Sequence, residues 1–154
     1  MNQLHGLIRS GDIRHLAQVI EQAPGLVNLA DERGFTPLIL ATYLDNQDVA
    51  ELLIRHGADV NARGAGGNTA LMGVCFKGST ELVRLLIENG ADLNLQNSQG
   101  TTALIFAVTF AQADIVKLLL EKGADTSLTD QAGLTALEHA QREGHPGLAA
   151  LLTK

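Results

Sequence analysis

The chain has 154 residues, 45% of them hydrophobic and 18% charged, with a formal net charge of −6. It contains no apolar run near the roughly 18 residues of a membrane span, and its eleven Lys and Arg residues are scattered. We therefore expect a soluble protein with neither a membrane nor a nucleic-acid partner, because binding to phosphate needs clustered positive charge. The start, MNQLHGLIRSGD, lacks the pattern of a secretory signal, which favours the cytoplasm.

A period of 33 residues organises most of the sequence. Glycines recur in this step at Gly34, Gly67, Gly100 and Gly133, and a threonine lies two positions after each one. Gly-Ala-Asp triplets and leucine pairs keep the same step. A fixed period between about 20 and 50 residues is typical of a solenoid, in which each unit buries its apolar face only against its neighbours.

Each unit is predicted to form two short helices. In the first full unit, Leu38 and Ala41 lie on one face of the first helix, and Val49, Leu52 and Leu53 lie on one face of the second. Helices of about two turns are marginal alone, so stacking between units must supply most of the stability.

Start and stop signals delimit these helices. Thr36 followed by Pro37 predicts a helix start, and Thr135 with Glu138 has the spacing of a capping box. Each Gly-Ala-Asp triplet predicts a stop at its glycine, where a left-handed conformation is needed. Its aspartate is expected to bind loop amides. These triplets begin at Gly57, Gly90 and Gly123.

The repeated units resemble ankyrin repeats. The resemblance rests on segments such as GFTPLILATYLDNQDVAELLIRHGADVNAR, and on residues 1–30, which are similar to an amino-terminal capping repeat. It implies an all-α solenoid of helix-turn-helix units joined by β-turn or hairpin-like loops. We expect one domain over residues 1–154, divided into a capping repeat at 1–30, repeats at 31–63, 64–96 and 97–129, and a closing repeat at 130–154. Polar residues in the last unit lead us to expect no missing repeat.

Two departures from the family pattern carry structural expectations. The family histidine of the first helix is replaced in turn by Ile39, Met72, Ile105 and Glu138. Its usual hydrogen bonds to neighbouring loops are therefore in question. Asp45 and Ala111 stand where the family prefers glycine between the two helices, which predicts strained turns.

No catalytic or metal-binding pattern interrupts the period. Cys75 lies in an apolar stretch and is expected in the core, and the five histidines have no spacing typical of zinc sites. The glycines at 64, 66 and 67 lack the Lys-Ser/Thr of a phosphate loop, and Ser98 has no histidine within its repeat. We expect no enzyme activity, no metal and no cofactor.

The aromatic residues mark the candidate binding surface. Of five such rings, Phe106 is expected in the core, whereas Phe35, Tyr43, Phe76 and Phe110 fall at positions that ankyrin repeats use for contact. With polar neighbours, the candidate partner-binding residues are Arg33, Phe35, Tyr43, Phe76, Lys77, Gln99, Phe110 and Arg142. The alternative is that the rings fold back and cover their own helix ends.

The sequence favours a non-catalytic protein that binds a partner protein through its concave face, as an inhibitor or a scaffold, and is monomeric when free. Two other functions stay open. Tyr43, Phe76 and Phe110 are expected to form a stripe along the concave face, beside Phe35, and this stripe could bury itself in a symmetric homodimer. A closed pocket with convergent polar groups would instead favour an enzyme or a small-molecule receptor.

Overall fold

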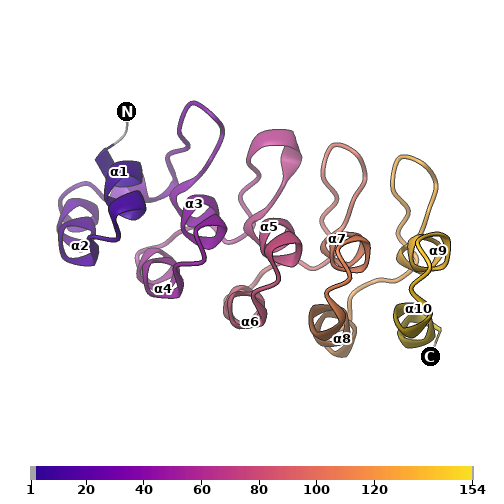
Figure 1. Cartoon of the computed structure of the whole chain (residues 1–154). Helices are drawn as coiled ribbons and strands as arrows, with labels where there is room; N and C mark the ends of the chain where they lie inside the picture. Colours follow the sequence, from indigo (N-terminus) through magenta and orange to yellow (C-terminus); the bar gives the residue numbers. More distant parts are fainter. Residues whose placement is uncertain (1–2, 154) are drawn as a thin grey trace.

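A computed structural model describes residues 3–153, which form five successive pairs of helices (Figure 1). The pairs are α1 (Gln3–Ser10) with α2 (Ile13–Gln22), α3 (Pro37–Tyr43) with α4 (Gln47–Arg55), α5 (Ala70–Lys77) with α6 (Thr80–Glu88), α7 (Ala103–Thr109) with α8 (Ala113–Glu121), and α9 (Ala136–Arg142) with α10 (Pro146–Leu152). The first helices form one row and the second helices another. Short 3-10 helices occur at Pro24–Asn28 (η1) and Ala65–Gly67 (η2).

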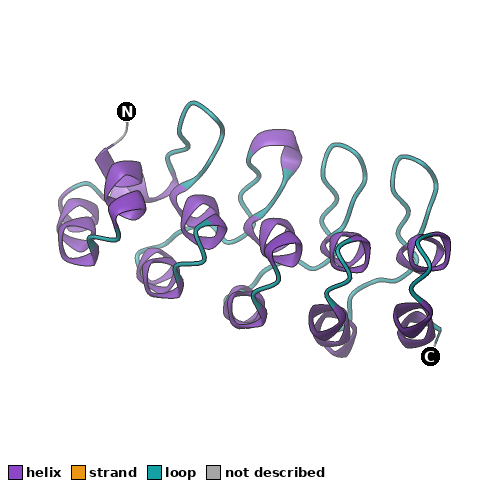
Figure 2. Cartoon of the chain, in the orientation of Figure 1, coloured by secondary structure: helices purple, strands orange, loops and turns teal. Residues whose placement is uncertain are grey.

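The described residues contain helices and loops and no strands, which confirms the all-α solenoid (Figure 2). A long loop projects from the first row of helices before each of α3, α5, α7 and α9. Backbone hydrogen bonds close these loops like short hairpins, as between the Asn97 amide and the Thr101 carbonyl at 3.0 Å. The longest helix has 10 residues, and none of the helices over residues 3–153 could cross a membrane.

Threonines start the first helices, as expected. The side chains of Thr36, Thr69, Thr102 and Thr135 each accept the backbone amide three residues later, at 3.1 to 3.3 Å. Glu138 completes a capping box by accepting the Thr135 amide at 2.7 Å. Each contact satisfies amides that a helix start leaves without a partner, so the first helices begin at fixed residues.

The turns that end the helices take the left-handed conformation. Gly57, Gly90 and Gly123 have φ of 92°, 93° and 89°, which confirms the predicted stops. Asp45 and Ala111 also have positive φ, 57° and 55°, at the position held by Gly78 and Gly144 in other repeats. The predicted strain in these two turns is confirmed, because a side chain in this conformation costs about 1–2 kcal/mol.

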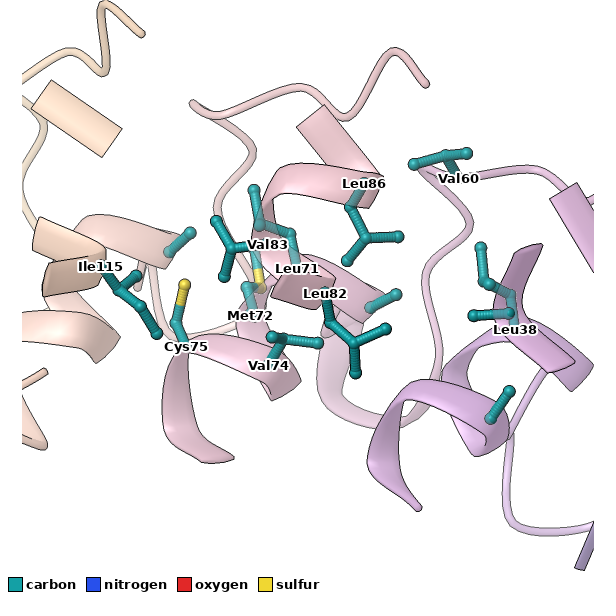
Figure 3. Close-up of a cluster of buried hydrophobic side chains, with 14 of the residues drawn as sticks. Leu38, Val60, Leu71, Met72, Val74, Cys75, Leu82, Val83, Leu86 and Ile115 are labelled. Atoms are coloured by element: carbon teal, nitrogen blue, oxygen red, sulfur yellow. The ribbon is translucent and has the colours of Figure 1, made fainter. Parts of the chain in front are cut away.

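Equivalent apolar residues stack along the array to form one continuous core. Leu53, Leu86 and Leu119 of the second helices are fully buried, and Leu38, Leu71 and Leu104 of the first helices are almost so. Figure 3 shows Leu71, Leu82 and Leu86 within one cluster of buried apolar side chains. Cys75 belongs to this core, and its burial raises the pKa of the thiol, which keeps it protonated and unreactive.

Asparagines join successive units on the side of the Gly-Ala-Asp triplets. Asn28 donates to the Gly57 carbonyl at 3.1 Å and accepts the Asp59 amide at 2.7 Å. Asn61 makes the same two contacts one unit later, at 3.0 and 2.7 Å, with Gly90 and Asp92. The aspartate carboxylates accept amides within their own loops, as predicted, for example Asp59 from Asn61 at 2.9 Å.

Leu86→Ala is expected to lower the free energy of unfolding by about 2–5 kcal/mol, because it opens a cavity in the fully buried stack. Leu29→Ala removes a leucine that is 51% exposed and serves as the control, with little change expected. Urea unfolding of both variants makes the comparison. An equal effect of the two substitutions would contradict the assigned helix faces.

Ala111→Gly is expected to raise stability by about 1 kcal/mol, because glycine adopts φ near 55° without a side-chain clash. The expected readout is a higher Tm in calorimetry. A lower Tm would show that the gain in entropy of the unfolded chain outweighs the relief of strain.

Candidate functional site: an aromatic surface and its pocket

The candidate site lies on the surface formed by the first helices and the loops before them, which we call the inner face. Its exposed rings stand where α3, α5 and α7 end. Tyr43 and Phe76 are each 48% exposed, and Phe110 is 42% exposed. In α5, the C-cap Gly78 donates to the Val74 carbonyl and Gln112 donates to the Phe76 carbonyl, at 2.7 and 3.2 Å, so hydrogen bonds fix the helix end that carries Phe76.

The rings form two pairs, not one continuous stripe. Phe35 meets Tyr43 edge-on with 5.9 Å between ring centroids, and Phe76 meets Phe110 in the same way at 4.6 Å. Both geometries are favourable for aromatic pairs. The Lys77 ammonium lies 4.6 Å from the centre of the Tyr43 ring, a cation-π distance. Five of the candidate binding residues are therefore brought together.

The other three candidates stand apart from this cluster. Arg33 and Gln99 lie on the loops before α3 and α7, and Arg142 ends α9 at the repeat position that Tyr43 and Phe76 hold in α3 and α5. Gln99 has a contact of its own, since its carbonyl accepts the Gln131 amide of the next loop at 2.8 Å. Gln99 and Arg142 belong to later repeats, so only a partner that extends along several repeats could contact them together with the aromatic pairs.

A pocket of about 260 Å³ opens on the inner face between α3 and α5. Its walls are mainly apolar and include Phe35, Tyr43, Met72, Phe76 and Phe106. Met72 is only 2% exposed, and its sulfur accepts the Thr69 amide at 3.5 Å, which holds its side chain against the helix start. The pocket joins the two aromatic pairs, since it is lined by both Tyr43 and Phe76.

Gly73 creates much of this space. The equivalent positions in the flanking repeats carry Leu40, which is buried, and Phe106. A Cβ built on Gly73 would meet nothing within 4 Å. Phe106 is half-buried and stacks on Phe110 with 6.4 Å between centroids, so its expected place in the core was only partly right. Its ring borders the pocket because no side chain at position 73 covers it.

A second glycine, Gly64, shapes the loop at the other end of the pocket. Asp31, Asn97 and Asp130 hold this position in other units, and each accepts two amides of its own loop. Gly64 has no such group, and its loop forms the 3-10 turn η2 instead. Its Cβ would lie 2.7 Å from the Gly34 carbonyl oxygen, so only glycine permits this approach of the two loops.

The histidines serve structural contacts. His5 Nε2 lies 2.7 Å from the Phe35 carbonyl of the next unit, at the helix position that Ile39 holds one repeat later. His139 Nε2 lies 2.6 Å from a carboxylate oxygen of Asp130. Burial alone would raise the pKa of Asp130, but hydrogen bonds from His139 and two loop amides lower it overall. Among the described residues, no His, Cys, Asp and Glu side chains gather as a group of three that could hold a metal ion.

Comparison with known proteins assigns this helical array to a family. The family model described as "Ankyrin repeats (3 copies)" matches residues 71–154, and the model for a single ankyrin repeat matches residues 33–65. The chain belongs to the ankyrin-repeat family. Ankyrin repeats are generally protein–protein interaction modules.

The chain is 37% identical over 60 residues to an ankyrin repeat-containing protein of Treponema pallidum, and 38% identical over 56 residues to the DNA-binding protein RFXANK of Homo sapiens. It is 40% identical over 63 residues to the human ankyrin repeat family A protein 2. These alignments cover 39%, 36% and 41% of this chain and 20%, 22% and 20% of the relatives. The chain thus matches about a fifth of the length of each relative.

The pocket was not anticipated from the sequence, although a signal for it exists. Comparing the ankyrin units position by position shows glycine at 73 between Leu40 and Phe106, and glycine at 64 between Asp31 and Asn97. Gly73 marks a place where the repeat leaves space, and Gly64 marks a place where two loops approach too closely for a side chain.

Gly64→Ala is expected to destabilise the chain by about 1–3 kcal/mol, because the added methyl group would overlap the Gly34 carbonyl and the Ile39 side chain. Gly25→Ala is the control, since its Cβ would meet nothing within 4 Å. Thermal unfolding followed by circular dichroism compares them. Equal midpoints for both variants and the wild type would show that the two loops can separate without cost.

Proposed function

We propose that this chain binds another protein through the inner face and has no catalytic activity of its own, acting as an inhibitor or a scaffold. The observation that carries the proposal is the exposure of Tyr43, Phe76 and Phe110 on one surface. Aromatic residues contribute a large share of binding energy in protein interfaces. Leu44 is also exposed beside Tyr43, so four of the six exposed large apolar side chains within residues 3–153 lie at the ends of α3, α5 and α7.

A protein partner is favoured over DNA. The name of the human relative RFXANK describes DNA binding, but this chain has 17 acidic and 11 basic residues with no basic cluster. Phosphate binding needs concentrated positive charge. The aromatic rings and the nearby cation Lys77 instead resemble the composition of a protein interface, with an apolar centre and a polar rim.

The pocket between α3 and α5 does not itself have the features of a small-molecule site. Such sites usually enclose about 300–1,000 Å³ and offer several convergent polar groups. The pocket between α3 and α5 is smaller, at about 260 Å³, and mainly apolar. We extend the proposal to a single domain with the repeat boundaries given above, located in the cytoplasm and monomeric when free.

Phe76→Ala combined with Phe110→Ala is expected to weaken partner binding by at least about 2 kcal/mol, roughly 30-fold in Kd, because it removes one complete aromatic pair. Thermal unfolding should change little, since both rings are nearly half exposed. Capture from an extract of the native cell with wild type and variant side by side identifies the partner, and titration calorimetry then measures the affinity.

Leu29→Ala is the matched control, because Leu29 is exposed but lies outside α3, α5 and α7. Equal affinity of the double variant and the wild type would contradict the proposal. Sedimentation of the free protein addresses the competing function: a dimer that the double variant disrupts would assign the aromatic surface to self-association.

A further inference from the structure

We propose that the pocket beside Gly73 anchors one bulky aliphatic side chain of the partner, and that an acidic residue next to this side chain pairs with Lys77. The inference rests on the proposed function and specifies the chemistry of the segment that the inner face binds. Three observations support it: a glycine without a packing reason, a pocket of limited size, and a cation without an acidic partner.

Gly73 has no evident structural reason to be glycine. It is the fourth of eight residues in α5, where glycine costs about 1 kcal/mol relative to alanine. Its Cβ would meet nothing within 4 Å, and it is absent from the residues with positive φ. The same position holds Leu40 in α3, so a leucine can be accommodated at this helix position. What glycine provides here is open space on the inner face.

The volume of that space suits a single side chain. A cavity of about 150 Å³ can hold a benzene molecule, and most small-molecule sites begin near 300 Å³. The pocket, at about 260 Å³, falls between these limits. Its walls include methyl, thioether and ring groups from Ile39, Met72 and Phe106. A leucine-like side chain would exchange water contact for these apolar surfaces, which is favourable.

The charge near the pocket selects an acidic neighbour. The residues that line the pocket carry no formal charge. Lys77 lies over the ring of Tyr43, which belongs to that lining, and within residues 3–153 it forms no salt bridge. Asp45 and Glu81 line the same surface depression as Lys77. A partner carboxylate must therefore compete with these two carboxylates for the Lys77 ammonium. Because the chain is acidic overall, this cation is a specific contact point.

The test uses Met72 as a reporter inside the pocket. The chain has two methionines, Met1 and Met72, so labelling the methionine methyl groups with carbon-13 provides a signal from the pocket wall. The probes are three short peptides: acetyl-Leu-Asp-amide, acetyl-Leu-Asn-amide and acetyl-Ala-Asp-amide. Both leucine peptides should shift the Met72 signal, and the alanine peptide should not. The aspartate peptide should bind about two- to fivefold more tightly than the asparagine peptide at low salt. Lys77→Gln should abolish that difference.

Glycine variants provide the matched controls. Gly73→Leu should fill the pocket and remove the response of Met72 to every peptide. Gly73→Ala and Gly6→Ala both place a methyl group in open space at the fourth position of an eight-residue helix, so both should raise Tm. Only Gly73→Ala should weaken binding of the leucine peptides. If Gly73→Leu folds poorly, this alanine pair still separates the pocket from helix stability.

Several outcomes would overturn the proposal. They are a Met72 signal unmoved by the leucine peptides, a response that survives in Gly73→Leu, and a shift that depends on protein concentration without peptide, which would place a second copy in the pocket. Phe110 lies outside the pocket lining but Phe76 belongs to it, so Gly73→Leu, which leaves both rings in place, is the variant that separates the two proposals. If Phe76→Ala with Phe110→Ala weakens capture of the partner while Gly73→Leu does not, the inner face binds the partner and the anchor is wrong.

Discussion

Burial of apolar side chains between neighbouring units is the constraint on which the structure depends. Each unit contributes helices of 7 to 10 residues, too short to be stable alone in water. The fully buried leucines Leu53, Leu86 and Leu119 place one contact of the same kind in each of the three middle units. Because each unit buries its apolar side chains against the next unit, the exposed side chains of the inner face are not needed to build the core. Its side chains can vary from unit to unit, and those that do vary form the candidate site.

The separation between core residues and inner-face residues explains how large exposed rings and a pocket can coexist with a well-packed array. Phe76 and Phe110 pair with each other over the ends of α5 and α7, and their helices remain anchored by Cys75 and Val108 on the opposite side. Gly73 costs helix propensity without disturbing the stack beneath it. A surface assembled this way can accept changes in specificity at little risk to the fold, which is a general property of repeat proteins.

The sequence predicted the parts of the structure that local chemistry controls. Thr36 and Thr135 cap helices, Gly57 and Gly90 end them, and Asp45 and Ala111 are strained, because each depends on a few neighbouring backbone atoms. The core leucines followed from periodicity.

The site was harder to predict. The exposure of Tyr43, Phe76 and Phe110 was predicted from their repeat positions, but the pairing of rings depends on side-chain rotamers that spacing does not determine. The pocket owes its space to the side chain that is missing at Gly73, and a search for motifs looks for groups that are present. The partial exposure of Phe106 has the same origin, because it reflects an empty neighbouring position.

The asparagine contacts between units have a consequence for any ligand of the array. The oxygens of Asn28, Asn61 and Asn94 accept the amide of the next Gly-Ala-Asp aspartate at 2.7, 2.7 and 2.8 Å. A hydrogen bond of nearly constant length between an asparagine side chain and the backbone thus fixes the spacing between these units, whatever the size of the core residues. A bound chain would therefore meet equivalent contact positions of successive repeats at even intervals.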